Sequence, residues 1–346
     1  MRAAIRKRQA GVSAIELMVA MLLGLVLIGG AISIFLASKR SYTEVEQVSA
    51  LTENAQFAQR LLNNALMHAG FFGEVPFNLI GVYPDGPPKA VTGGCTGDAA
   101  AYDLQNYLSA AVADADGDAL GCVTDAVPGS HVLVLKSVSP TPFTDGPRGN
   151  PDPDAADDGD GTIDTPTELS GTQTYIMTND TLGYLFDGAT PPSIQTGDDV
   201  PGGVAWAYQY EVFYVREGAT PNAAPQLSRR VIIPTGSGGM MLVTEDLVEG
   251  VEDMRLRFGL ASAASLNGDV DTYTTTVAIA GNWSRVESVE ISILVRSVNK
   301  DPNYTNLKSY SMAGTTFTPE DNFRRMLITN TISLRNPKLV IRGNGA

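Results

Sequence analysis

The feature that most constrains this chain is a run without any charged residue over residues 17–37, close to the N-terminus. As an α-helix, these 21 residues would reach about 31 Å, roughly the thickness of the hydrocarbon core of a bilayer. Glu16 stands at the head of the run, and a basic tail precedes it: Arg2, Arg6, Lys7 and Arg8. The sequence therefore predicts a membrane-spanning helix with a cytoplasmic N-terminus, because basic flanks are retained on that side.

The small residue Gly11 lies before the apolar run, whereas a secretory signal has its small-residue cleavage site after its apolar region. A cut after Gly11 would remove the basic tail and keep the helix. This arrangement resembles the class III signal of type IV prepilins and pseudopilins, which a prepilin peptidase cuts and then methylates at the new amino group. The family pattern is Gly, usually Phe, then Thr-Leu-Ile-Glu, and the chain departs from it at Val12, Ser13 and Ala14. The resemblance implies a leader of residues 1–11.

Glu16 becomes the fifth residue of a chain cut in this way. A carboxylate inside a membrane helix costs about 3 kcal/mol on insertion scales, and such groups are usually functional. In pilins, the resemblance implies, this glutamate pairs with the free amine of an adjacent subunit and fixes axial register during assembly. The alternative is a signal anchor that carries one acid near its interface.

The chain of 346 residues has 38 Asp and Glu against 24 Lys and Arg, a formal net charge of −14. Loss of the leader, which holds four of the bases and no acid, takes the charge to −18. This excess of acid argues against nucleic acid as a partner, because phosphate binding needs concentrated Lys and Arg. It suits divalent cations or a basic protein surface.

Two cysteines, Cys95 and Cys122, lie in the part of the chain expected outside the cytoplasm. A disulfide is the default there, and for a loop of about 28 residues chain entropy predicts about 3.6 kcal/mol of stabilisation. A metal site would have to combine the two thiols with the distant His68 and His131. We therefore expect a structural disulfide.

Apolar residues recur at steps of three or four over residues 38–69, which predicts that the helix continues beyond the membrane. The stripe consists of Tyr42, Val45, Val48, Leu51, Ala55, Ala58, Leu62, Ala65 and Ala69. Gly70 follows as a stop signal. We expect a helical spine over residues 12–70, about 87 Å long if unbroken, with its transmembrane segment at 17–37.

Residues 71–346 are expected to form a β-rich head. The expected strands are 131–138, 173–178, 183–186, 207–216, 227–233 and 286–297. Residues 132–135 are continuously apolar and predict a buried strand, whereas alternation over 208–214 predicts a half-buried one. Residues 139–168, rich in Pro and Asp, predict an acidic loop insertion. The predicted class is α+β and pilin-like: a long N-terminal helix packed on a mainly antiparallel β-sheet head with large loop insertions.

Three C-terminal blocks carry a closer resemblance, together with Ala69-Gly70-Phe71-Phe72-Gly73 after the spine. Residues 247–259 are predicted to be a short helix leading into a strand, 286–297 alternate, and 323–336 close the chain. These blocks look like the PilW family of type IV pilus minor pilins, relatives of the J-type pseudopilins of type II secretion. The resemblance covers the spine and roughly residues 240–340.

The strand at 286–297 is expected to pack its Val and Ile face on the outer half of the spine. Arg324, Arg325 and Arg335 then either cap sheet carbonyls, pair with acids of the spine, or remain solvated.

Two aspartate-rich loops offer the oxygen ligands that calcium prefers. The carboxylates are Asp114, Asp116, Asp118 and Asp125 in the first loop and Asp158, Asp160 and Asp164 in the second. Against an EF-hand template, Ala119 replaces the usual glycine of the first loop, and Ala156 leaves the first ligand position of the second loop empty. The cofactor prediction is Ca²⁺ at one of these loops, with the second favoured. The alternative is a solvated acidic loop.

An enzyme is not expected, because the chain has no Gly-x-Ser-x-Gly, His-Glu-x-x-His or phosphate-loop motif. His68 and His131, its two histidines, are expected to be packing or surface residues. The paired aspartates lie in loops, which is a weak basis for acid–base chemistry.

The resemblance implies a minor pilin that primes type IV pilus assembly and sits at or near the tip, in a system that serves adhesion and twitching motility. Its implied partners are the prepilin peptidase, other minor pilins, the major pilin, the assembly platform in the inner membrane and a tip adhesin. The implied location is the inner membrane, with the head periplasmic, and later the pilus tip. The alternatives are a J-type pseudopilin and a receptor-binding module that uses the acidic insertion as an adhesive surface.

Overall fold

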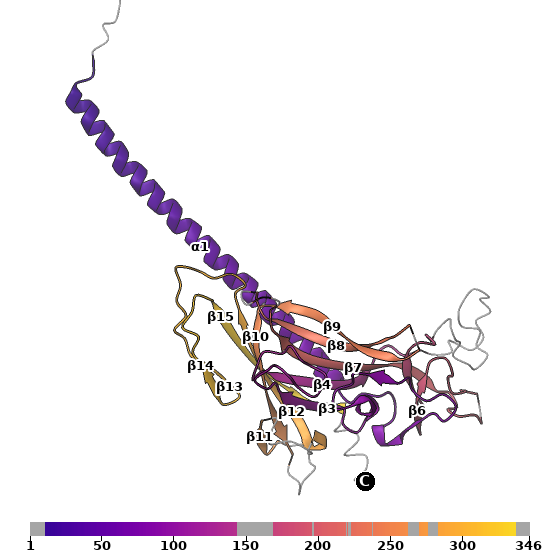
Figure 1. Cartoon of the computed structure of the whole chain (residues 1–346). Helices are drawn as coiled ribbons and strands as arrows, with labels where there is room; N and C mark the ends of the chain where they lie inside the picture. Colours follow the sequence, from indigo (N-terminus) through magenta and orange to yellow (C-terminus); the bar gives the residue numbers. More distant parts are fainter. Residues whose placement is uncertain are drawn as a thin grey trace, which may run out of the picture. The chain divides into compact units, whose positions relative to one another are not determined.

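The computed structural model describes residues 11–143, 169–195, 197–218, 220, 223–236, 238–261, 270–275 and 283–336. Figure 1 labels the helices and strands. The chain divides into two compact units, Met1–Ala50 and Leu51–Ala346. An α+β architecture with one long N-terminal helix is confirmed.

The helix α1 (Ala14–His68) begins directly after Ser13 and runs without a break. It stops before Gly70, whose φ of +72° is a left-handed conformation that glycine adopts without strain. The apolar part of α1 in the first unit is exposed, and it is long and apolar enough to cross a membrane. A helix with exposed apolar residues all round is unfavourable in water, so this part is compatible with membrane anchoring.

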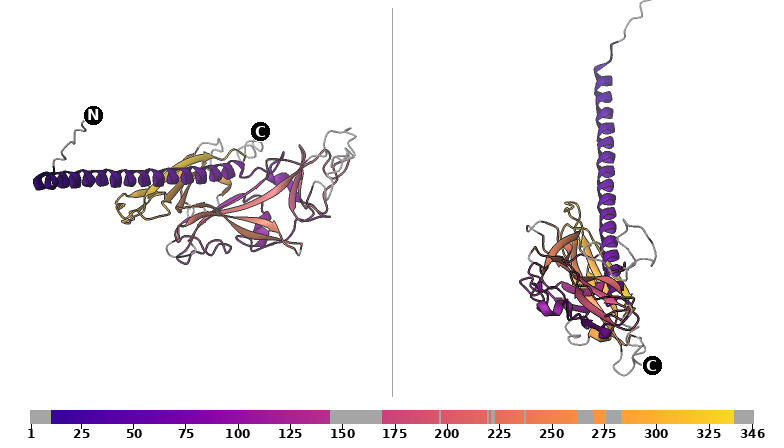
Figure 2. Two further views of the ribbon diagram at one scale, coloured as in Figure 1. Left: turned by 90° about the horizontal axis from the view of Figure 1, so that it is seen from above. Right: turned by 90° about the vertical axis from the view of Figure 1, so that its right-hand side faces the viewer.

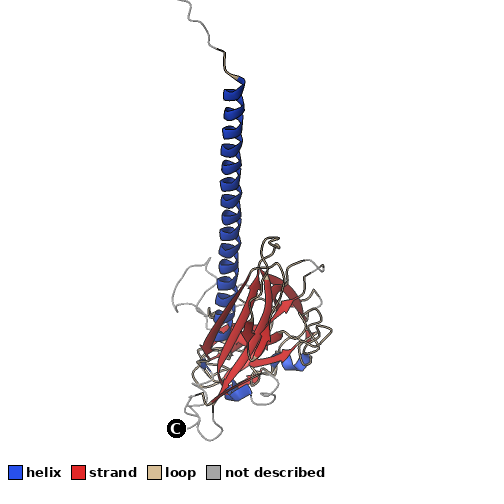
Figure 3. Cartoon of the chain, turned by 90° about the vertical axis from the view of Figure 1, so that its left-hand side faces the viewer, coloured by secondary structure: helices blue, strands red, loops and turns tan. Residues whose placement is uncertain are grey.

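The second unit consists mainly of strands, drawn red in Figure 3, with short 3₁₀ turns η1 (Phe77–Leu79), η2 (Asp98–Tyr102) and η3 (Trp283–Arg285). The strands are β1 (Ile80–Val82), β2 (Val91–Thr92), β3 (Leu108–Val112), β4 (His131–Val138), β5 (Thr174–Thr178), β6 (Gly183–Asp187), β7 (Val204–Arg216), β8 (Gln226–Pro234), β9 (Met240–Glu249), β10 (Val251–Leu260), β11 (Thr272–Thr274), β12 (Val286–Arg296), β13 (Tyr310–Met312), β14 (Thr315–Phe317) and β15 (Arg325–Ser333). The six strands expected from the sequence are all present, with bounds shifted by up to three residues.

The larger sheet has the order β1-β6-β5-β7-β8-β9-β2, and β4 joins it beside β7 with β3 on its outer side. Its pairs are antiparallel except β1 with β6 and β2 with β9. The long strand β7 carries β4 and the segment that follows it along one edge, and β5 and then β8 along the other. Because β7 is central, its side chains from Val212 to Val215 are buried on both faces, which corrects the prediction of a half-buried strand over its whole length. The strand β4 is buried throughout, as predicted.

The smaller sheet has the order β11-β10-β12-β15 and is antiparallel. It lies beside the larger sheet in both views of Figure 2, where its strands are orange to yellow. Its central strand β12 is buried on both faces. Leu294 packs in a separate cluster with Tyr310 and Met312 of the β13–β14 hairpin, so the segment between β12 and β15 folds back over this sheet.

The main core joins both sheets to the part of α1 that belongs to the second unit. Its helix members are Leu51, Ala55, Ala58, Leu62 and Leu66, with Ala69 just beyond the end. The predicted stripe is confirmed in this unit, except that Leu66 is fully buried where Ala65 is partly exposed. Asn54 donates to the carbonyl of Glu249 (3.0 Å) and anchors the helix to the end of β9.

The helix predicted at the start of residues 247–259 is wrong. The strand β9 ends at Glu249, Gly250 turns the chain with φ +86°, and β10 begins at Val251 in the other sheet. A β-bulge between Val251 and Asp253 places Val251 and Met254 on the same buried face. These two residues are three apart, and this spacing imitates a helical period.

Candidate functional site

Gly11 and Val12 lie in the exposed segment that precedes α1. A side chain added at Gly11 would meet no atom within 4 Å. The fold of the chain therefore makes no steric demand for glycine at this position. A requirement for a small residue here would have to come from another molecule.

Glu16 makes a contact that the sequence prediction missed. The backbone N–H of Ser13 donates to Glu16 Oε2 (3.2 Å), and the N–H of Leu17 donates to the carbonyl of Ser13 (3.0 Å). Ser13-Ala14-Ile15-Glu16 has the Ser-x-x-Glu spacing of a capping box, in which the glutamate satisfies a backbone donor at the helix start. Glu16 thus caps its own helix within the isolated chain.

The predicted bond between Cys95 and Cys122 is present, and both residues are buried. Their neighbours Thr96 and Leu120 have positive φ values of 64° and 55°. The N–H of Thr96 donates to the carbonyl of Leu120 (2.8 Å). Left-handed conformations of this kind cost about 1–2 kcal/mol each, and the disulfide and this hydrogen bond both join the two strained segments.

The first aspartate-rich loop does not assemble the predicted calcium ligands. Asp114 Oδ1 accepts the backbone N–H groups of Asp116 and Asp118 (both 2.9 Å), which closes a turn. Asp125 forms an ion pair with Arg216 (2.6 Å). Within the described residues, no group of three or more His, Cys, Asp or Glu is placed to hold a metal ion. Calcium at this loop therefore stays a prediction.

The favoured carboxylates of the second loop, Asp158, Asp160 and Asp164, lie outside the described residues.

His131 ties the two sheets together. Its Nδ1 accepts the backbone N–H of Leu256 in β10 (3.1 Å). Burial, with a smaller contribution from Arg255, lowers the pKa of His131 to about 4, so the ring is neutral near pH 7. The other histidine, His68, hydrogen-bonds through its Nδ1 to the carbonyl of Asn64 within α1 (2.8 Å). Both histidines have structural partners.

An arginine cluster lies where β10, β12 and β15 meet the segment 297–324. The side chain of Arg325 is 2% exposed. It donates to Glu252 Oε1 (2.7 Å) and Asp321 Oδ2 (2.7 Å). Burial alone would lower the pKa of Arg325, but its hydrogen bonds and attraction to the two carboxylates raise it above the ordinary value. Glu252 is the extra residue of the β10 bulge, so the bulge turns this carboxylate toward β15.

The neighbouring arginines fix the same segment. Arg324 pairs with Asp301 (3.0 Å), and its guanidinium lies 4.3 Å from the centre of the Tyr304 ring. Arg296 lies 4.2 Å from the centre of the Phe323 ring. These partners belong to the head. Of the three alternatives left open by the sequence, Arg325 also caps a carbonyl, that of Phe323 (3.4 Å). Arg335 is exposed.

A model of the PilW family, described as Type IV Pilus-assembly protein W, matches residues 212–336, which run from within β7 to just beyond β15. This region of the chain is similar to the PilW family. The match contains the whole arginine cluster and the residues of the predicted C-terminal blocks. The match supports a role in type IV pilus assembly. Searches of curated proteins and of solved structures gave no match.

The PilW match covers about a third of the chain and does not include α1. Cleavage after Gly11 and the register role of Glu16 therefore stay predictions. The resemblance of the C-terminal blocks to PilW proteins is confirmed.

Proposed function

We propose that this chain is a non-enzymatic minor pilin that, with other minor pilins, primes assembly of a type IV pilus and sits at or near its tip. One observation carries the proposal: a single chain joins a PilW region to an N-terminal helix whose apolar half is exposed. A filament subunit that is stored in a membrane needs such a helix, since it packs against lipid before assembly and against other subunits afterwards.

The proposal includes processing at the predicted leader. The prepilin peptidase would cut between Gly11 and Val12 and methylate Val12. The open surroundings of Gly11 support this step, because the segment is accessible and the fold leaves the choice of residue to an external partner.

Before assembly, the chain would cross the inner membrane once, with a cytoplasmic N-terminus and a periplasmic head. Its proposed partners are other minor pilins, the major pilin, the assembly platform and a tip adhesin. The disulfide fits the periplasm, where such bonds form and persist.

The first experiment uses a matched pair of glycines. Gly11→Leu should leave full-length precursor in the membrane, whereas Gly24→Leu should be cut normally, because a side chain at either position meets no atom within 4 Å. Mass spectrometry of the wild-type chain should find a methylated Val12 at the N-terminus. Any other mature N-terminus would refute the proposed processing.

The second experiment tests the assembly role. Deletion of the chain should reduce surface piliation, and the tagged wild-type chain should be recovered in sheared filaments. The J-type pseudopilin alternative predicts instead that secretion of folded proteins is lost while piliation stays normal. The PilW match favours the pilus.

A further inference from the structure

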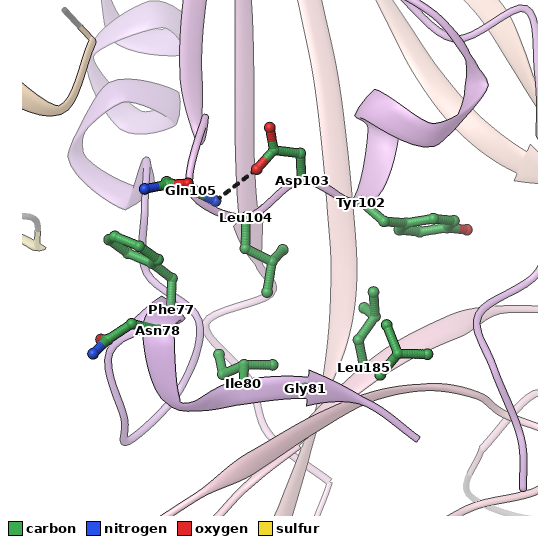
Figure 4. Close-up of a pocket in the computed structure, with 10 residues that line it drawn as sticks. Phe77, Asn78, Ile80, Gly81, Tyr102, Asp103, Leu104, Gln105 and Leu185 are labelled. Carbon is green, nitrogen blue, oxygen red and sulfur yellow. Dashed lines mark hydrogen bonds between the residues drawn. The ribbon is translucent and has the colours of Figure 1, made fainter. Parts of the chain in front are cut away.

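An open cavity of about 340 Å³ lies between β1 and the loop that follows η2 (Figure 4). Two buried core residues contribute to its wall, Leu104 and Leu185, which are 7% and 2% exposed. Phe77 and Ile80 add further apolar surface. The cavity has the size of a site for a small ligand or for an anchoring side chain, and its lining is part apolar and part polar.

The strand β1 forms one end of the larger sheet. It pairs in parallel with β6, and no other described strand pairs with its outer edge. The N–H of Tyr83 donates to the carbonyl of Leu185 in β6 (3.0 Å). Because the polar groups of alternate residues point to the same side of a strand, Gly81 and Tyr83 face β6. The N–H and C=O of Val82 therefore point to the free edge.

Apart from the shortness of β1, this edge lacks the protection that exposed edges usually have. Natural proteins place charges, proline or bulges on edge strands, because an open edge pairs with other chains. Here Leu79 and Val82 are 46% and 55% exposed, and residues 77–83 contain neither a charge nor a proline. An apolar edge beside a cavity with a partly apolar wall has the features of strand addition, in which backbone hydrogen bonds provide affinity and a side-chain pocket provides specificity.

We propose that the outer edge of β1 receives an extended segment of another pilus subunit, which adds as a strand and places an apolar side chain in the cavity. That the partner is another pilus subunit rests on the proposed function. The free N–H and C=O of Val82 would pair with the backbone of the added strand.

The charged residues around the cavity indicate which kind of residue the partner segment carries beside its apolar side chain. Asp103 is the charged residue among the ten that line the cavity. Its carboxylate accepts hydrogen bonds from the N–H of Gln105 and the side chain of Asn106, and its backbone carbonyl accepts one from Lys136 (2.8 Å). Around β1, residues 70–88 contain Glu74 and Asp85 but no base. A segment with a Lys or Arg beside its apolar anchor fits this rim. A second copy of this chain, with its net charge of −14, fits it less well.

A pair of substitutions at Val82 separates backbone pairing from side-chain effects. Val82→Pro removes the outward N–H while the hydrogen bonds of Gly81 and Tyr83 to β6 stay available. Val82→Thr keeps the N–H and the branched shape. We expect recovery of the Pro variant in sheared filaments to fall at least tenfold and recovery of the Thr variant to match that of the wild type. Equal recovery of the Pro variant and the wild type would overturn the proposal.

Amide hydrogen exchange of the wild-type chain tests the same edge without relying on a variant. The full chain in detergent should exchange the amide of Val82 rapidly, and the chain in purified filaments should exchange it at least tenfold more slowly. If the chain is present in filaments and this amide stays unprotected, strand addition is refuted while the proposed function stands. Absence of the wild-type chain from filaments would refute the proposed function and the inference together. Protection that grows with concentration in the purified chain alone would assign the edge to a second copy and overturn the choice of partner.

Discussion

Replacement of Arg325 by methionine should destabilise the head strongly. Methionine fills a similar volume but cannot bind Glu252 and Asp321, and the two carboxylates would then lie close together with Arg296 as their neighbouring cation but without their hydrogen-bonded partner Arg325. Removal of one partner from a buried ion pair costs about 3–5 kcal/mol, because the remaining charge is left uncompensated. Glu252 and Asp321 are 18% and 33% exposed, so water screens part of this cost. We expect the unfolding free energy to fall by about 3 kcal/mol.

A second ion pair on the same sheet is the matched control. Arg257 of β10 and Glu290 of β12 are joined at 3.3 Å, and the arginine side chain is 38% exposed. Exposed pairs contribute about 0–1 kcal/mol, so Arg257→Met should change the unfolding free energy by no more than about 1 kcal/mol.

Urea unfolding of the purified full chain measures both variants, and the melting temperature of Arg325→Met should fall by roughly 6 °C or more.

The pH dependence of the unfolding free energy adds an internal check. The hydrogen bond from Arg325 is the main cause that holds the pKa of Asp321 below its ordinary value of 3.8. This contribution is present above pH 4 and is lost as the pH falls through the folded-state pKa. The difference between wild type and Arg325→Met should therefore shrink below pH 4. Equal stability of Arg325→Met and Arg257→Met at pH 7 would refute the reasoning.

Three further predictions concern the head. Cys95→Ala with Cys122→Ala should lower the unfolding free energy by about 3 kcal/mol, and alkylation of the wild-type exported chain without reductant should label no thiol. Ala313 has φ +48° beside Gly314 in the β13–β14 turn, so Ala313→Asn should raise stability by about 0.5–1 kcal/mol in urea unfolding. His131 has a lowered pKa of about 4, so the unfolded chain binds a proton that the folded chain does not between about pH 6.5 and 4. Stability should fall as the pH drops through this window, and His131→Asn should flatten the slope.

The sequence predicted the elements that depend on local pattern. The period of three to four residues located α1, Gly70 located its end, and runs of β-branched and aromatic residues located β4, β5 and β8. The error at residues 247–259 has a local cause as well. One extra residue, Glu252, changes the inward spacing from two to three, and a strand with a bulge then has the apolar pattern of a helix turn.

Most of the site depends on contacts that no local pattern reveals. Glu252 and Arg325 are 73 residues apart, and they meet because β10 and β15 both border β12. The free edge of β1 could not be predicted from local sequence either. A three-residue strand of ordinary composition lies at an edge only because of the order of the strands in the sheet. The ion pair between Asp125 and Arg216, which are 91 residues apart, likewise could not be predicted from the spacing of the aspartates.

The two roles of Glu16 make different demands on its charge. As a cap, Glu16 needs only an oxygen that accepts the N–H of Ser13, and glutamine provides one. As the partner of a neighbouring subunit's amine, it needs the negative charge, which acts strongly only where water is scarce. Glu16→Gln therefore keeps the cap and removes the charge, whereas Glu16→Ala removes both.

We expect both variants of Glu16 to insert and to be cut after Gly11, and both to be depleted in sheared filaments at least tenfold, because the register role depends on charge. Quantitative immunoblots of membranes and of filaments measure the two steps separately. If Glu16→Gln enters filaments like the wild type and only Glu16→Ala fails, the cap explains the glutamate and the register role is refuted. If Glu16→Ala also enters normally, the carboxylate serves neither role in assembly, and the chain would tolerate a loss of about 1 kcal/mol at the start of its helix.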